Sequence, residues 1–218
     1  MKRAAILFLL LLPPPATDAL AEPPRAQAEP APTHLEPVGE PHDLSYMHKA
    51  FPEAFTRDAV AWMDAGYAFG ARKDLTILKR TEQGFRLVYI DTPMVFGDDF
   101  SGGAGGYDPK PARCVYDIPK ALGRRILEAT RAVLRQTRDS GDKDIAPLGA
   151  SYEFFARDGA KALRGKVDNP GAGSEPDMLA SVLTPFEHTC PSGVGYREGD
   201  IESTLGQLER RIRREKPR

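Results

Sequence analysis

The sequence predicts an α+β domain in which an antiparallel sheet, built from two β-hairpins, packs against amphipathic helices and carries one disulfide. Two segments of strand-like residues fold back around short turns, within residues 75–92 and 152–167. Three later segments repeat apolar residues at the spacing of a helix. The chain has two cysteines, Cys114 and Cys190, and in an exported protein such a distant pair is expected to be bonded.

Export itself is predicted by residues 1–21, which have the features of a secretory signal peptide. A cationic start is followed by a short apolar run over residues 4–12, and Ala19 and Ala21 place small residues at a cleavage site. That run is far shorter than the roughly 20 residues that a membrane-spanning helix needs. We therefore expect cleavage after Ala21, a periplasmic or extracellular protein, and no transmembrane segment in the mature chain.

Residues 22–43 read as a disordered, Pro/Ala/Glu-rich arm. Six prolines are interleaved with Ala and Glu, and Leu35 and Val38 are the sizeable aliphatic residues there. Such a stretch buries too little apolar surface to offset its ordering entropy. The single α+β domain is expected to occupy residues 44–216.

The domain is predicted to open with two helices. Asp43 caps a short helix that reaches Phe51. Pro52 then begins a second helix, which ends near Gly66 and has four apolar residues at helical spacing: Phe55, Ala59, Trp62 and Met63. Trp62 is interpreted as a core residue rather than an exposed aromatic that binds sugar.

Two hairpins form the predicted sheet. The first joins residues 75–80 to 85–92 through a turn that ends at Gly84. Its second strand is apolar on both faces over residues 87–90, which indicates a central strand covered on each side. The second hairpin joins residues 152–157 to 160–167 through Asp158-Gly159, a dipeptide that tolerates positive φ.

Three helices are expected to cover the sheet. Asp117 is expected to cap a helix that runs to about Arg138. Pro176 opens a shorter helix, which Pro185 kinks or stops, and the last helix starts after Asp200. Their apolar stripes are, in chain order, Ile118, Leu122, Ile126, Ala129 and Val133; Leu179, Val182, Leu183 and Phe186; and Ile201, Leu205, Leu208 and Ile212.

The charge balance gives no general reason to expect a nucleic acid as partner. The formal net charge is −1, and it becomes about −2 once residues 1–21 are removed. A candidate basic patch nevertheless lies on the predicted 117–138 helix: Arg124, Arg125, Arg131 and Arg135. Together with the arginine-rich C-terminus it would contact lipid phosphates or an acidic protein if both helices presented arginines on one surface. A solvated helix face is the simpler interpretation.

The glycine-rich segment 97–111 is a candidate interaction loop. Its polar residues are Asp98, Asp99, Tyr107 and Asp108. Carboxylates are oxygen ligands for calcium, but their spacing here does not match the twelve-residue calcium loop. We expect a mobile loop that binds no metal, and no cofactor anywhere in the chain.

These observations predict a non-enzymatic, exported binding or interaction module. The common catalytic signatures are absent, including Gly-x-Ser-x-Gly and His-Glu-x-x-His. The sequence does not specify the ligand; an envelope or secreted protein is the expected kind of partner. The alternative is an exported hydrolase of unfamiliar type that uses loop 97–111 together with His48 or His188.

Overall fold

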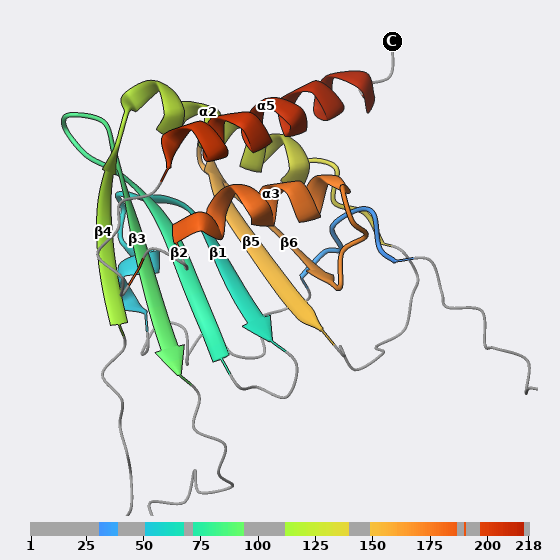
Figure 1. Cartoon of the computed structure of the whole chain (residues 1–218), viewed down its shortest axis with the longest axis horizontal. Coiled ribbons are helices and arrows are strands. Elements are labelled where there is room, and N and C mark those ends of the chain that lie inside the picture. Colours follow the sequence, from blue (N-terminus) through green and yellow to red (C-terminus); the bar gives the residue numbers. More distant parts are fainter. Residues whose placement is uncertain are drawn as a thin grey trace, which may run out of the picture.

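An antiparallel sheet forms the centre of the computed structural model, with three helices along one of its faces (Figure 1). The structure describes residues 31–38, 51–67, 72–93, 112–139, 149–186, 190 and 197–215. In chain order the elements are η1 (Pro52–Phe55), β1 (Ala59–Tyr67), β2 (Arg72–Arg80), β3 (Phe85–Pro93), β4 (Ala112–Ile118), α2 (Lys120–Leu134), β5 (Ala150–Asp158), β6 (Lys161–Asp168), α3 (Glu175–Leu183) and α5 (Glu198–Glu215).

The strand order is β4-β3-β2-β1-β5-β6, and every neighbouring pair is antiparallel. The first four strands form a meander, and the β5–β6 hairpin adds to it beside β1. Both predicted hairpins are therefore present in one sheet, and the predicted α+β class is confirmed.

The two hairpin turns follow local chemistry. Between β2 and β3, the amide of Thr81 donates to the carbonyl of Gly84 at 3.0 Å, and the amide of Gly84 donates to the Thr81 hydroxyl at 3.0 Å. Between β5 and β6, Asp158 pairs with Lys161, so the loop is Gly159-Ala160 rather than Asp158-Gly159. Gly159 has φ 62, the left-handed conformation that favours glycine at the first position of such a turn.

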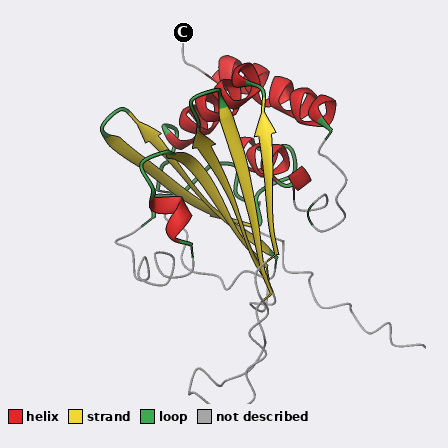
Figure 2. Ribbon diagram, turned by 90° about the vertical axis from the view of Figure 1, so that its left-hand side faces the viewer, coloured by secondary structure: helices red, strands yellow, loops and turns green. Residues whose placement is uncertain are grey.

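Apolar side chains fill both faces of the sheet. On the helix side, Leu87 and Tyr89 join the main core with residues of all three helices. On the opposite side, Val88 and Ile90 belong to a smaller core that includes residues of η1. Figure 2 shows this layering, with η1 on the opposite side of the sheet from the long helices. The prediction that residues 87–90 are covered on both sides is confirmed.

The helix predicted from Pro52 to Gly66 is wrong. Only residues 52–55 are helical, as one 3-10 turn, and residues 59–67 form strand β1 between β2 and β5. A strand buried on both faces carries apolar residues at nearly every position, so a helical spacing can always be selected from them. Trp62 is nonetheless a core residue, 3% exposed and stacked on Phe155 with 5.3 Å between the ring centroids. The helix predicted from Asp43 to Phe51 lies outside the described residues, except for Phe51 itself.

Strand β4 is a second difference, because it occupies the start of the predicted 117–138 helix. Asp117 does not cap that helix. It lies in β4, and its carboxylate accepts a hydrogen bond from Arg86 at 2.8 Å. Helix α2 begins at Lys120 after Pro119, without a side-chain cap. The apolar stripe predicted for this helix is buried, although its first residue lies in β4: Ile118, Leu122, Ile126, Ala129 and Val133.

Helices α3 and α5 agree with the sequence prediction. The Ser174 side chain caps α3 by accepting from the Asp177 amide at 3.3 Å, and α3 ends at Leu183, two residues before Pro185. Helix α5 starts at Glu198, slightly before the expected position. The predicted apolar residues of both helices are buried: Leu179, Val182, Leu183, Phe186, Ile201, Leu205, Leu208 and Ile212.

Residues 31–38 depart from the expectation of a solvated arm. Leu35 is 1% exposed and belongs to the main core, because Gly165 of β6 has no side chain where Leu35 packs. Glu36 and Lys166 exchange backbone hydrogen bonds at 2.7 and 2.9 Å, which pairs this segment with the edge of the sheet. Residues 1–30 and 39–50 lie outside the described residues, so the signal peptide, the rest of the arm and the domain boundary stay predictions.

Candidate ligand-binding site

A cavity of about 590 Å³ lies where residues 31–38 meet the helix layer. The end of α2 and the residues after it form one wall, and the start of α3 and the second half of α5 form the others. This volume falls within the roughly 300–1,000 Å³ of small-molecule sites in proteins. The lining residues are Thr33, His34, Leu35, Ala132, Val133, Arg135, Gln136, Arg138, Glu175, Pro176, Arg211 and Ile212.

The exposed fraction of each lining residue indicates how deep it lies in the cavity. The apolar lining residues Leu35, Val133 and Ile212 are at most 7% exposed and continue into the main core. Arg135 and Arg138 are exposed, and Arg211 is half-buried. The cavity therefore has an apolar floor and a cationic rim.

Protein contacts hold two of the rim arginines in place. Arg135 donates to Asp158 Oδ2 at 3.0 Å through Nε and at 2.6 Å through Nη2. These bonds lower the pKa of the Asp158 carboxyl, since they stabilise its charged form. Arg211 Nη1 donates to the carbonyl of Gly173 at 2.6 Å, just before α3.

The third rim arginine, Arg138, is positioned through its backbone. Its amide donates to the carbonyl of Leu35 at 3.0 Å, which ties the end of α2 to residues 31–38. Across the part of the chain that the structure describes, its guanidinium forms no hydrogen bond or ion pair. Arg138 is thus the rim cation that is most available to a ligand.

Glu175 adds a buried carboxylate to the cavity lining. It is 4% exposed at the first turn of α3, where the helix dipole favours an anion. Gln136 Nε2 donates to Glu175 Oε2 at 2.9 Å and so connects α2 with α3. Three arginines and one glutamate among the lining residues leave an excess of positive charge at the rim.

The four arginines of the candidate basic patch differ in their contacts. Arg125 forms two hydrogen bonds to Glu209 of α5, at 2.9 and 3.1 Å, and this contact raises its pKa. Arg131 Nε donates to the carbonyl of Arg157 at 2.6 Å. Arg124 is exposed on α2 and does not line the cavity. Of the four patch residues, Arg135 lies at the cavity, where Arg211 of α5 joins it.

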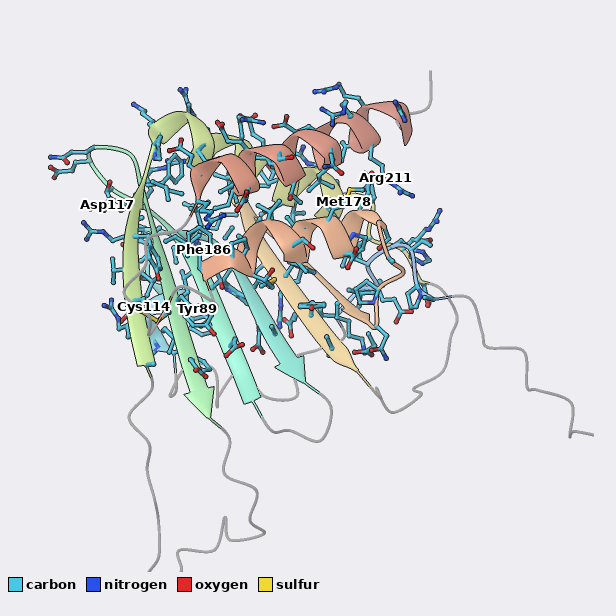
Figure 3. The ribbon with its side chains drawn as sticks, viewed as in Figure 1. Tyr89, Cys114, Asp117, Met178, Phe186 and Arg211 are labelled. Carbon is cyan, nitrogen blue, oxygen red and sulfur yellow. A yellow bond between two sulfur atoms is a disulfide. The ribbon has the colours of Figure 1, made fainter. Side chains whose placement is uncertain are left out.

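The predicted disulfide is confirmed. Cys114 of β4 and Cys190 are bonded, with 5.6 Å between their Cα atoms and a sequence separation of 76. Cys114 is directly opposite Tyr89 of β3 in the sheet, and Phe186 packs on Tyr116 with 5.3 Å between the rings. The bond therefore ties the segment after α3 to the edge strand. Figure 3 shows Cys114 and Arg211 far apart, so the disulfide does not belong to the cavity.

The candidate interaction loop lies outside the described residues: Asp98, Asp99, Tyr107 and Asp108. The same holds for His48 and His188. Among the residues that the structure does describe, no three of His, Cys, Asp and Glu gather as a metal-binding group. The expectation of a mobile, metal-free loop stays a prediction.

A second polar group lies at the end of the β2–β3 hairpin that is far from its turn. Asp74 and Asp91 are directly opposite each other on the helix side of the sheet, and Asp74 is 2% exposed. Side chains in such a pair have Cβ atoms about 5 Å apart. Tyr89 lies on the same face, two residues before Asp91. Sequence reasoning missed this pair. The apolar residues Leu75, Ile77 and Ile90 point to the opposite face of the strands, so alternation places both carboxylates on the same face.

Sequence reasoning also missed most of the cavity. It treated His34 as part of the arm, considered Arg211 only as part of the arginine-rich C-terminus, and gave no role to Gln136 or Glu175. The local signals are weak, because the lining comes from four separate segments. The one usable signal was the basic character of the ends of α2 and α5.

Comparison with known proteins adds no assignment. The chain matches no protein-family model, and it matches no curated protein sequence. Within the described part of the chain, none of the helices has the length and apolar character needed to cross a membrane. The function must therefore be argued from the cavity.

Proposed function

We propose that this protein is an exported, non-enzymatic binding module that holds a small molecule in the cavity between residues 31–38 and helices α2, α3 and α5. One observation carries the proposal: a cavity of about 590 Å³ combines an apolar floor with several polar side chains at its rim. Ligand sites in proteins have this composition, in which apolar walls supply contact area and a few polar groups fix orientation.

The contacts around the cavity support binding rather than a reaction. Arg135, Gln136 and Arg211 each hold a protein partner on a different segment: Asp158, Glu175 and Gly173 respectively. Such contacts fix the walls before a ligand arrives, which reduces the entropy lost on binding. The predicted signal peptide, together with the disulfide, favours a role in the cell envelope or outside the cell.

Native mass spectrometry of the full protein, purified from cells that export it, tests the proposal. We expect a small-molecule adduct on the wild-type protein and its loss from Ala132→Phe, which fills the cavity. Ala121→Phe is the matched control, because Ala121 is exposed on the same helix and does not line the cavity. Thr33→Trp fills the cavity from its exposed rim, so it gives the same test without a change in the core.

Two outcomes contradict the proposal. One is an adduct that survives in both Ala132→Phe and Thr33→Trp. The other is a wild-type protein that carries no adduct and whose thermal midpoint does not rise in a metabolite extract of the exporting cells.

A hydrolase remains the second candidate, and the Asp74–Asp91 pair favours it. The pair lies at the end of β3 from which the chain continues toward the acidic segment 97–111. Two neighbouring carboxylates can divide acid and base roles, because each disfavours ionisation of the other. A hydrolytic activity that is lost in both Asp74→Asn and Asp91→Asn, with binding at the cavity retained, would support this candidate.

A further inference from the structure

We infer that the ligand of the cavity is an anionic amphiphile: an apolar body that carries one terminal carboxylate or phosphate. This inference rests on the proposed function and specifies the ligand's chemical class. It depends on how charge and apolar surface are distributed between the rim and the floor.

The rim is built to receive one anionic group. Arg138 follows the end of α2 and Arg211 lies in α5, and both line the same cavity. Arg211 donates to the Gly173 carbonyl and adds a positive charge to the rim, which favours an anion there. Arg138 has no side-chain partner in the described part of the chain, and a ligand anion would supply one.

The floor is built to receive an apolar group. Leu35 and Val133 are 1% and 2% exposed, and Pro176 and Ile212 are buried beside them. An apolar ligand body on this floor would remove further apolar surface from water, which is favourable in proportion to the area covered.

The floor also excludes a second anionic group. Glu175 is a buried lining residue, 4% exposed, and Gln136 donates a hydrogen bond to its carboxylate. A carboxylate pushed to this depth would lose its hydration among apolar side chains and meet a carboxylate of the protein. The cavity should therefore prefer an anion with one charged end to an anion of equal length with two.

Isothermal titration calorimetry of the full protein with four simple probes tests the ligand class. Octanoate and octyl phosphate carry one anionic end, suberate carries two, and octylamine carries a cation. We expect octanoate or octyl phosphate to bind, and we expect suberate and octylamine to bind at least about tenfold more weakly. The tighter binder of octanoate and octyl phosphate identifies the head group. Inorganic phosphate, as a head group without an apolar body, should show no saturable binding.

Arg138→Gln should weaken binding of the tighter of these two probes by about tenfold or more, because it removes a charge-assisted contact. Arg124→Gln is the matched control: the residue is exposed on α2, is outside the cavity and should leave the affinity unchanged. Equal losses in the two variants would show nonspecific attraction to a basic surface and overturn the inference.

The remaining outcomes separate the inference from the proposed function. Octylamine or suberate could bind as tightly as octanoate and lose this binding in Ala132→Phe. That result would support the cavity as a binding site and overturn the inferred ligand class. If inorganic phosphate binds as tightly as octyl phosphate, the inference that the ligand has an apolar body is overturned. If neither octanoate nor octyl phosphate binds, the inference is overturned, while the native adduct decides the proposed function independently.

Discussion

At the scale of single residues, Gly123 shows how closely helix α2 approaches the sheet. A Cβ atom at this position would lie 2.5 Å from Cδ2 and 2.6 Å from Cβ of Phe85, which is itself buried. Gly206 of α5 is the opposite case, since its nearest contact would be the flexible end of Arg210 at 3.5 Å. The same substitution should therefore have opposite effects in the two helices.

Gly123→Ala should lower the free energy of unfolding by about 1–3 kcal/mol, because overpacking outweighs the better helix propensity of alanine. Gly206→Ala should raise it by up to about 1 kcal/mol. Urea unfolding monitored by circular dichroism measures both. A stabilising Gly123→Ala would show that α2 lies farther from Phe85 than the structure places it.

Asp158 should contribute stability that depends on pH. Hydrogen bonds from Arg135 hold its pKa below the ordinary value in the folded protein. A carboxyl with a lowered folded pKa stabilises the protein above the unfolded pKa of about 3.9, and this contribution is lost as the pH falls through the folded value. Asp158→Asn should therefore be slightly less stable than the wild type at pH 7. The difference should shrink as the pH falls below about 3.9 and vanish below the folded pKa.

Urea unfolding at several pH values between these limits checks the prediction. The double variant Arg135→Gln/Asp158→Asn serves as the control for the pair. At pH 7 its loss should be smaller than the sum of the single losses, because both single variants break the same contact. A difference between wild type and Asp158→Asn that stays constant with pH would assign the effect to something other than the carboxylate charge.

At the scale of elements, the placement of residues 31–38 has the clearest consequence. Leu35→Ala should lower the free energy of unfolding by about 2–5 kcal/mol, as expected for a buried leucine in a core. Val38→Ala, at a half-buried position in the same segment, should cost much less. Thermal or urea unfolding distinguishes the two. If both variants lose a negligible amount of unfolding free energy, residues 31–38 belong to a solvated arm, as their composition suggests.

The disulfide between β4 and the segment after α3 should be structural. In the chain-entropy account, a loop of this length is worth about 4.5 kcal/mol, and measured values are commonly lower. Cys114→Ala/Cys190→Ala should lower the thermal midpoint and keep the α+β circular dichroism spectrum; alanine avoids burying a hydroxyl at the fully buried Cys190. Because the bond lies far from the cavity, ligand affinity measured below the lowered midpoint should not change. A loss of affinity in the folded double variant would contradict the separation of the two sites.

Elements with strong local signals were predictable from the sequence. Gly159 occupies a turn position with positive φ, and the apolar stripe of α3 is bounded by the Ser174 cap and by Pro185. The apolar stripe of α5 repeats clearly at helical spacing. Strands β1 and β4 were not predicted, for different reasons. Strand β1 is buried on both faces and loses its alternation, whereas β4 is a short edge strand that was merged with the helix after Pro119.

The candidate site was predictable only in part. Arg135 was identified through the basic character of α2, but its neighbours Glu175 and Arg211 come from α3 and α5. Leu35 was identified as a rare aliphatic residue in a proline-rich stretch, without a partner to pack against. Leu35 packs against Gly165, which lies more than a hundred residues later in the chain. No local sequence pattern connects the two residues.

At the scale of the whole molecule, one sheet supports two separate features on its helix side. The disulfide and Phe186 lie toward the β4 edge, and the cavity lies toward the opposite edge, where residues 31–38 pair with β6 (Figures 1 and 3). The described sheet and helices thus support the cavity, and residues 31–38 complete its walls. We therefore expect the proposed ligand binding to depend on the docking of residues 31–38.

Mapping of amide chemical shifts in ¹H–¹⁵N spectra during a titration with octanoate is the most direct measurement of the central claim. The account predicts saturable shifts at residues 33–35, 132–138, 175–176 and 211–212, which surround the cavity, and their absence in Ala132→Phe. Shifts confined to surfaces elsewhere, such as the exposed Arg213 and Arg214, or shifts that persist unchanged in Ala132→Phe, would contradict it.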